Sequence, residues 1–389
     1  MQFIDLRRQQ QRIRNSIEKR IQTVLDHGRY IMGPEIGELE ESLASYVGVK
    51  HAISCASGTD ALLLALMAYG VKSGDAIFTT PFSFIATTET IAMLGATPVF
   101  VDIDPATFNM DPVQLENAIE AFLSSGSTKY PLPAAAKVSE LHPRGIIGVD
   151  LFGLPADYRT INEIAERHGL FVIEDAAQSF GAEYFAAKAC GLAQIGCTSF
   201  FPAKPLGGYG DGGMCFTDDD QLAHTIHSMR LHGQGSHKYD HIHIGINGRL
   251  DTLQAAILMA KFEIFPEEIG LRQQVAQNYS QLLTSGASPL FPPVIPKDCL
   301  SVWAQYSVLA KSDEIRPILL DKLKESGIPT AIYYPKPLHL QAVLSYLGYK
   351  EGDFPVSEDC ARRIFSLPMH PYLEKEDQER IATVLLDQL

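Results

Sequence analysis

Hydrophobic and polar positions recur with a helical period through the first fifty residues. Apolar residues are spaced three and four apart over 9–27 and again over 36–47, so we predict two helices there. From residue 51 the pattern changes to short β-branched runs separated by helical stretches. The runs predict strands at 51–55, 76–80, 98–102, 145–151, 170–174, 197–201 and 213–217. Between or after them, helices are predicted over 59–69, up to residue 94, over 157–168 and over 218–231.

The regular alternation of strands and helices indicates an α/β protein. Crossovers of this length make neighbouring strands parallel, and a parallel sheet needs helices on both faces. After residue 249 the pattern becomes one long helix over 250–265, then a proline-rich loop at 288–296 and a smaller mixed segment. We therefore predict a large domain, residues 1–255, with a mainly parallel sheet and an N-terminal helical segment, and a small C-terminal α/β domain, residues 256–389. The Ser-, Pro- and Ala-rich segment 123–142 is predicted to be a surface insertion.

Composition and charge narrow the classes of function. The 389 residues carry 32 Lys and Arg against 46 Asp and Glu, a net charge of −14, which disfavours binding to nucleic acid or anionic lipid. No apolar run follows the N-terminal charges, and the longest apolar stretch, 91–101, is far shorter than the roughly 20 residues of a membrane helix. The six cysteines form no C-x-x-C pair. Reduced thiols, no membrane partner and a cytoplasmic location are expected.

Two candidate groups follow predicted strands, at the sheet edge where α/β proteins bind ligands. The turn Ser57-Gly58-Thr59-Asp60 opens a helix, whose free N–H groups and dipole suit a phosphate. A helix start capped by Thr59 or Asp60 is the simpler explanation of this turn taken alone. Asp175, in Glu174-Asp175-Ala176-Ala177-Gln178, ends a hydrophobic strand. A carboxylate buried there needs a partner, which is a protonated heterocycle, an arginine of the fold or a helix cap.

The third candidate group is Lys204, which lies between Phe201 and Pro205 and precedes the glycine-rich run 207–213. Pro205 disfavours helical backbone at Lys204, and the glycines let a ligand approach closely. Most lysines are solvated surface charges, but a buried lysine loses its charge and becomes an amine nucleophile. At the ordinary pKa of about 10.4 only about 0.04% of the amine is neutral at pH 7, so such a role needs burial or an imine.

Two other patterns do not support a cofactor or a metal. Residues 208–213 match G-x-G-x-x-G, but 214–217 resemble a strand and not the helix that a dinucleotide fingerprint opens. No nicotinamide cofactor is predicted. A histidine-rich segment lacks the cysteine or the carboxylate pair that would complete a metal site, so no metal is predicted and a polar or substrate-facing loop is expected. Its histidines are His232, His237, His241 and His243.

The order of the three groups resembles that of pyridoxal-phosphate enzymes of the aspartate aminotransferase fold, with a Lys 29 residues after the Asp. Longer strings are similar to the DegT/StrS-type nucleotide-sugar aminotransferases. They are F-I-D-L from Phe3, G-P-E from Gly33, S-G-T-D-A-L from Ser57, E-D-A-A-Q from Glu174, S-F-F-P-A-K from Ser199 and N-G-R-L-D-T-L-Q-A-A from Asn247. The resemblance spans nearly the whole chain and implies this fold. Because relatives that are dehydratases carry His at the position of Lys204, it also implies transamination.

The resemblance further implies roles for single residues. Lys204 matches the lysine that binds pyridoxal phosphate covalently and later moves protons, and Asp175 matches the carboxylate facing the pyridine nitrogen. Gln178 matches the side chain near the phenolic oxygen, and Phe84 the aromatic that stacks on the ring. The phosphate cup is matched by Gly58, Thr59, Asp60 and Ser199. Asn247 matches a residue that the family contributes from a neighbouring subunit, which implies a homodimer with composite active sites.

C-terminal strings resemble aminotransferases that act on UDP-linked 3-keto-N-acetylglucosaminuronate and supply surface polysaccharide. Tyr333, Tyr334 and His339 lie in these strings and, with Arg249, are the candidate substrate-binding residues. An arginine pairs well with a uronate carboxylate. Relatives often carry His where Tyr333 and Asp150 stand here.

Glutamate is the expected amino donor in this reading, with pyridoxamine phosphate as the aminated form of the cofactor. Two alternatives are open. One is a 4-keto-6-deoxy nucleotide-sugar aminotransferase, because the chemistry at the cofactor is the same. The other is a pyridoxal-phosphate-binding regulatory protein without turnover, which the intact set of Lys204, Asp175 and Gln178 disfavours.

Overall fold

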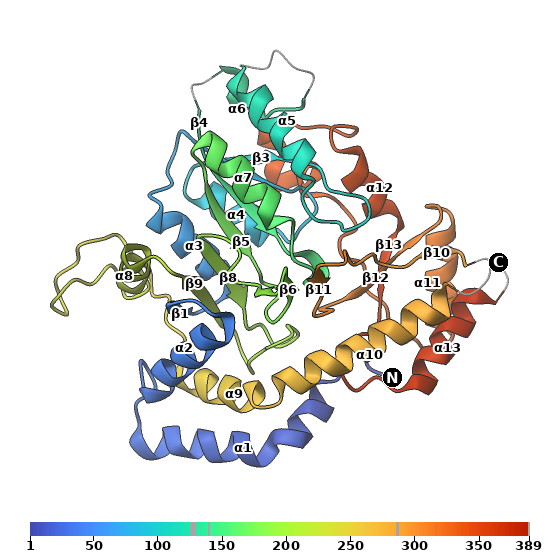
Figure 1. Cartoon of the computed structure of the whole chain (residues 1–389), viewed down its shortest axis with the longest axis horizontal. Helices are drawn as coiled ribbons and strands as arrows, with labels where there is room; N and C mark the ends of the chain where they lie inside the picture. The colour runs from blue at the N-terminus through green and yellow to red at the C-terminus, as the bar shows by residue number, and fades with distance from the viewer. Residues whose placement is uncertain (125–129, 139–140, 285–287, 388–389) are drawn as a thin grey trace.

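In the computed structural model, which describes residues 1–124, 130–138, 141–284 and 288–387, seven strands form a central sheet in the order β1-β9-β8-β5-β4-β2-β3 (Figure 1). Their bounds are β1 His51–Cys55, β2 Asp75–Thr79, β3 Thr97–Phe100, β4 His142–Val149, β5 Phe171–Asp175, β8 Ile195–Ser199 and β9 Gly213–Thr217. β9 is antiparallel to both of its neighbours, β1 and β8, and the remaining pairs are parallel. The other six strands of this sheet therefore share one direction.

Helices cover both faces of the sheet, which confirms the predicted fold class. Ile147 and Ile173 pack against one helical layer, and Ile146 and Val172, one position earlier, pack against the other. Strands buried on both faces therefore appear in the sequence as continuous hydrophobic runs. The first layer is made by α3 Gly58–Ala68, α4 Ala86–Met93 and α8 Asp220–Met229, and the second by α5 Pro112–Leu123 and α7 Tyr158–His168.

The N-terminal and middle helices pack together beside β1 and β9. They are α1 Leu6–His27, α2 Pro34–Val47, α9 Thr252–Phe262 and α10 Phe265–Leu283. The single helix predicted over 250–265 is wrong: α9 ends at Phe262 and α10 begins at Phe265. Pro266 explains the break, because proline lacks an N–H and fits the first turn of a helix better than its interior. Figure 1 shows α10 running from α9 towards α13 Lys375–Leu386.

Two smaller sheets complete the described fold. One has the order β10-β12-β13 and the other β11-β6-β7. Their strands are β10 Leu290–Phe291, β12 Tyr306–Ala310, β13 Ile364–Leu367, β11 Cys299–Leu300, β6 Glu183–Tyr184 and β7 Ala187–Lys188. The remaining helices are α6 Ala134–Val138, α11 Ile315–Glu325, α12 Pro355–Arg363 and the 3₁₀ turns η1 Leu151–Gly153, η2 Leu338–Leu340 and η3 Ala342–Leu347. The domain boundary predicted at 255/256 falls within α9 and stays a prediction.

Within the predicted surface insertion 123–142, the described part contains α6 and buries Leu132, while 125–129 and 139–140 lie outside the described residues.

Asp102, just after β3, joins the central sheet to the C-terminal part. Its carboxylate accepts hydrogen bonds from the backbone N–H groups of Val356 and Ser357 at 3.0 and 2.9 Å, in the first turn of α12. None of the described helices is both long enough and apolar enough to span a membrane.

Candidate functional site

Loops that follow β1, β2, β4, β5 and β8 meet at one edge of the sheet, because these strands point in the same direction. Each loop or strand end brings a polar or aromatic side chain to this edge. These side chains belong to Ser57, Phe84, Asp150, Asp175 and Ser199. In open α/β sheets this edge is where ligands bind.

The turn before α3 presents an anion-binding surface. Ser57 is the helix cap, with extended backbone and its Oγ accepting from the N–H of Asp60 at 3.0 Å. The expectation that Thr59 or Asp60 caps the helix is therefore wrong, since the helix already begins at Gly58. The N–H groups of Gly58 and Thr59 have no hydrogen-bond partner among the described residues. They point out of the positive end of the helix, which favours an anion.

Gly58 is required by a close approach between this turn and the end of β8. A Cβ atom at Gly58 would lie 2.6 Å from the Cβ of Ser199, so any side chain there would push the two segments apart. Ser199 is partly exposed and its Oγ accepts from the N–H of Phe201 at 3.2 Å, so its hydroxyl hydrogen is free to point to a ligand. The backbone N–H of Asp60 is taken by Ser57, which leaves Asp60 no amide for a ligand.

Asp175 ends β5 and is 5% exposed. Its Oδ2 accepts from Thr87 Oγ1 at 2.7 Å, and its Oδ1 accepts from the N–H of Ala177 at 3.3 Å. Burial raises the pKa of Asp175, while these two hydrogen bonds and the positive charge of Lys204 act to lower it. Within the described part of the chain Asp175 forms no salt bridge, so the carboxylate has room for a cationic partner.

Lys204 lies in the turn after β8, where its N–H donates to Phe201 O at 2.9 Å. Its side chain is partly exposed, yet the protein around the amine lowers its pKa from 10.5 to about 8. The negative charge of Asp175 raises this pKa but does not offset the burial. Lys204 and Asp175 are therefore close enough to influence each other without forming an ion pair, and the amine keeps a neutral fraction at physiological pH.

One wall of the site is made by the amide of Gln178 and the aromatic rings of Tyr334 and Phe84. Gln178 Oε1 accepts from the N–H of Phe152 at 2.8 Å, which orients the amide so that Nε2 donates to the hydroxyl of Tyr334 at 3.3 Å. Burial raises the pKa of Tyr334, so it stays a neutral phenol. Phe84 is tilted against Tyr334 with ring centroids 6.5 Å apart and is 55% exposed. Its exposed face is available to a planar ligand.

Asp150 supports this wall from inside the fold. It is fully buried and accepts from Ser179 Oγ at 2.6 Å and from the N–H of Ala156 at 3.0 Å. These bonds tie together the loops after β4 and β5, which carry Phe152 and Gln178. Burial raises the pKa of Asp150 to about 7. The sequence marked Asp150 only as a departure from relatives, because nothing local shows which loops it joins.

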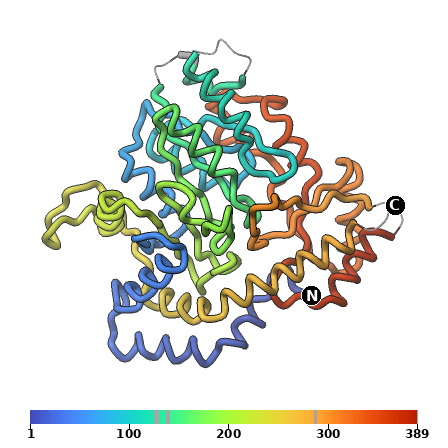
Figure 2. Tube along the Cα trace, in the orientation of Figure 1, coloured from blue at the N-terminus to red at the C-terminus, as the bar shows by residue number. Residues whose placement is uncertain are grey.

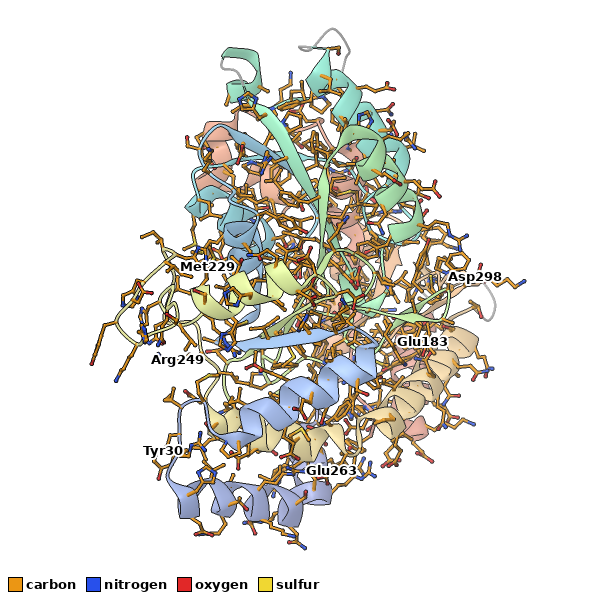
Figure 3. The ribbon with its side chains drawn as sticks, turned by 60° about the vertical axis from the view of Figure 1, so that its left-hand side comes forward. Tyr30, Glu183, Met229, Arg249, Glu263 and Asp298 are labelled. Atoms are coloured by element: carbon orange, nitrogen blue, oxygen red, sulfur yellow. The ribbon has the colours of Figure 1, made fainter. Side chains whose placement is uncertain are left out.

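Asn247 and Arg249 lie on the segment that returns from a long loop after α8. Figure 2 shows this loop leaving the body of the molecule, and Figure 3 shows Arg249 on the same side as Met229, where the loop starts. Gly248 O accepts from the N–H of Ala56 at 3.0 Å, so the segment runs beside the phosphate turn. Asn247 is exposed, and the Nε of Arg249 is buried without a hydrogen-bond partner among the described residues.

The C-terminal candidates divide into two groups. Tyr333 is partly exposed and lies beside Tyr334, with ring centroids 5.9 Å apart, and Tyr334 in turn lies against Phe84. His339 is 1% exposed and its Nε2 lies 3.0 Å from Glu358 Oε1, while its ring packs against Phe354. The structure therefore brings the tyrosines to the site and does not bring His339 there.

Thr87 was missed by the sequence reasoning, although it donates the shortest hydrogen bond to Asp175. It lies in the first turn of α4, three positions after Phe84, and its N–H donates to Phe84 O at 3.4 Å. That spacing was the available signal. It could not single out Thr87, because Thr88 and Thr90 in the same helix are equally buried.

The model of the DegT/DnrJ/EryC1/StrS aminotransferase family matches residues 11–386 of this chain. Over 385 residues the chain is 47% identical to the UDP-2-acetamido-2-deoxy-3-oxo-D-glucuronate aminotransferase of Pseudomonas aeruginosa, and the match covers 99% of each. It is 42% identical to a protein of Geobacillus stearothermophilus named "Pleiotropic regulatory protein", over 98% of this chain and 96% of that one. A DegT DnrJ EryC1 StrS aminotransferase from Brucella abortus has a crystal structure that superposes with a TM-score of 0.92 at 47% identity, covering 99% of this chain and 98% of that one.

Proposed function

The chain belongs to the DegT/DnrJ/EryC1/StrS aminotransferase family, and from this premise we propose that it transfers the amino group of glutamate to a UDP-linked 3-keto-N-acetylglucosaminuronate. Membership confirms the predicted aminotransferase activity and the cofactor, pyridoxal phosphate. One observation carries the proposal. At the carboxyl edge of the sheet, Lys204, whose pKa is lowered to about 8, lies close enough to the buried carboxylate of Asp175 for each charge to shift the pKa of the other group.

The residues at this edge fit pyridoxal phosphate group by group. Gly58 lets the turn before α3 lie against Ser199, which leaves two N–H groups open to a phosphate. Asp175, buried and without a salt-bridge partner in the described residues, suits a protonated pyridine nitrogen. Lys204 offers a partly neutral amine for a covalent bond to the aldehyde. Phe84 offers an exposed aromatic face to the ring.

The side chains divide the work of transamination between them. When bound, pyridoxal phosphate supplies an electron sink for the charge left when a proton leaves the carbon beside an amino group. Asp175 would keep a proton on the pyridine nitrogen, which keeps that sink effective. Lys204 Nζ, freed when the amino group of glutamate replaces it on the aldehyde carbon, would take the proton from the α-carbon as a general base and deliver it to that aldehyde carbon as a general acid. Gln178 and Tyr334 hold a pair of hydrogen-bonding groups beside Phe84, which would orient the ring oxygen.

The acceptor sugar is proposed from a relative of which the match covers 99% and from an unpartnered group of Arg249. The Pseudomonas aeruginosa enzyme is named for a 3-oxo-glucuronate substrate. Arg249 has a buried Nε without a partner among the described residues, and a uronate carboxylate would satisfy it as a charge-assisted hydrogen bond. The product would serve surface polysaccharide synthesis in the cytoplasm.

A homodimer is part of the proposal. Asn247 is exposed on a segment that runs beside the phosphate turn, at the base of a loop that extends from the body of the protein (Figure 2). Three side chains on that loop are large, apolar and exposed: Tyr239, Ile242 and Ile244. A second copy that covers this loop would remove them from water. The same contact would bring Asn247 to the partner's cofactor.

A substrate panel tests the function. Purified protein with pyridoxal phosphate and glutamate is offered UDP- and dTDP-linked sugars with a keto group at C3 or C4, and 2-oxoglutarate formation is followed. The 3-keto uronate is expected to be the best substrate, and Lys204→Ala is the matched control for turnover. Arg249→Gln is expected to reduce activity on the uronate more than on its neutral C6 analogue. Preference for a 4-keto sugar would overturn the substrate, and cofactor binding without 2-oxoglutarate would indicate a regulatory protein.

A further inference from the structure

Asp175 is held by a chain of two hydroxyl groups, one from Thr87 in α4 and one from Ser83 in the loop before it. Thr87 Oγ1 lies 2.7 Å from Asp175 Oδ2, and Ser83 Oγ lies 3.0 Å from Thr87 Oγ1. Thr87 is 0% exposed and Ser83 is 3% exposed, so water does not compete for these bonds. The same segment carries Phe84, which places the aromatic face and the hydroxyl chain on one turn of backbone.

The direction of the hydroxyl chain follows from the number of hydrogens. An ionised carboxylate only accepts hydrogen bonds, so Thr87 must give its single hydroxyl hydrogen to Asp175. Ser83 must then donate to the free lone pair of Thr87. The chain therefore supports the anionic form of Asp175 and leaves Oδ1, which takes only the long 3.3 Å bond from Ala177, as the less occupied oxygen.

We propose that Thr87 is a positioning residue for the transamination: its hydroxyl fixes the rotation and the negative charge of Asp175, so that Oδ1 is presented to the ring nitrogen of the cofactor. This inference rests on the proposed function, because it concerns the same site. Thr87 does not touch the reacting atoms. It acts by keeping one oxygen of Asp175 occupied.

The surroundings of Asp175 explain why one hydroxyl matters. Burial raises the pKa of Asp175, and the hydrogen bond from Thr87 is the largest influence that lowers it again. Five titratable groups lie close enough to Asp175 for its charge to shift their pKa, and none of them donates the hydrogen bond that Thr87 donates. They are Lys204 in the turn after β8, Tyr334 in the C-terminal wall, Cys197 on β8, Cys190 before β8 and Tyr158 on α7. Lys204 is the cation in this set, and its own pKa is lowered.

Thr87→Val removes the hydroxyl with little change of shape, and Thr87→Ser retains it. Dissociation constants for pyridoxal phosphate are measured with the purified apoproteins at pH 8. A hydrogen bond to a charged group predicts about tenfold to a hundredfold weaker binding for Thr87→Val. Thr87→Ser is expected to bind within about threefold of wild type. In an Asp175→Asn background, Thr87→Val should add almost nothing, because the charge that the hydroxyl supports is gone.

Stability of the apoprotein gives a readout that needs no cofactor. The pKa of Asp175 is raised in the folded state, so its contribution to stability is complete below its unfolded pKa and is lost as the pH rises through the folded pKa. Thr87→Val raises the folded pKa further and extends the loss to higher pH. The decrease in Tm relative to wild type should therefore be larger at pH 8 than at pH 5, and Ser83→Ala should show a weaker form of the same trend.

The outcomes separate this inference from the proposed function. Wild-type protein that binds no pyridoxal phosphate would refute the function itself. Wild-type protein that binds and turns over, with Thr87→Val and Thr87→Ser equal in affinity and in pH dependence, would refute only the role of Thr87. The role of Thr87 would also be refuted if Thr87→Val weakened cofactor binding by the same factor in the wild-type and the Asp175→Asn backgrounds. The effect would then not depend on the charge of Asp175 and would be structural.

Discussion

The pKa of Lys204 sets how fast the apoprotein captures pyridoxal phosphate, because only the neutral amine attacks the aldehyde. Lowering this pKa from 10.5 to about 8 raises the neutral fraction at pH 7 from about 0.03% to about 9%, roughly a 300-fold gain. Capture by wild-type apoprotein should therefore rise with pH to a midpoint near 8. Asp175→Asn removes the negative charge that raises the pKa of Lys204, so its midpoint should lie lower.

Rapid mixing of apoprotein with pyridoxal phosphate between pH 6 and 10 measures this midpoint from the growth of the yellow covalent form. Borohydride reduction followed by peptide mass analysis confirms that the modified residue is Lys204. Lys204→Arg gives the background from other lysines, and a blocked free lysine measured in parallel corrects for titration of the aldehyde and its phosphate. A wild-type midpoint near 10, or a midpoint that moves upward in Asp175→Asn, would refute the reasoning.

Three other substitutions test single contacts. Gly58→Ala would place a Cβ 2.6 Å from that of Ser199, so pyridoxal phosphate affinity should fall at least about tenfold; unchanged affinity would exclude the phosphate cup. Asp150 has a pKa raised to about 7, so its stabilising contribution is lost as the pH rises from about 4 to 7. Asp150→Asn should flatten the dependence of Tm on pH over this interval, and an unchanged slope would contradict that value. Tyr334→Phe removes the hydroxyl that Gln178 contacts; kcat should fall several-fold with circular dichroism unchanged, and full activity would remove Tyr334 from the site.

The central sheet could be predicted because its strands are buried on both faces. Ile146 and Ile147 face opposite helical layers, so the strand has no polar side, and the run stands out from the amphipathic helices around it. Strands such as β6 and β7, each of two residues, carry no periodicity and were not predicted. The break between α9 and α10 was missed because the hydrophobic pattern continues through Pro266, and backbone chemistry decides where the helix ends.

The candidate site was predictable where residues directly follow strands. Asp175 and Lys204 could be placed at one edge because strand direction alone brings strand ends together. His339 shows the limit of this argument: it stands in a string with the site tyrosines, yet its ring is enclosed by Glu358 and Phe354. Thr87 shows the converse limit, because a residue inside a helix reaches the site only through the packing of α4 on the sheet. Packing between elements distant in sequence leaves no local pattern.

Burial alone would neutralise both Asp175 and Lys204, since it raises the pKa of a carboxyl and lowers the pKa of an amine. Asp175 receives two hydrogen bonds, from Thr87 and Ala177, which support its anion, whereas no acceptor among the described residues holds the ammonium of Lys204. The two hydrogen bonds therefore limit the rise in the pKa of Asp175, whereas only the charge of Asp175 limits the fall in the pKa of Lys204 to about 8. A direct ion pair between them would stabilise the ammonium and remove the nucleophile. The separation of the two groups, together with the unequal supply of hydrogen bonds, is therefore what makes this edge of the sheet reactive.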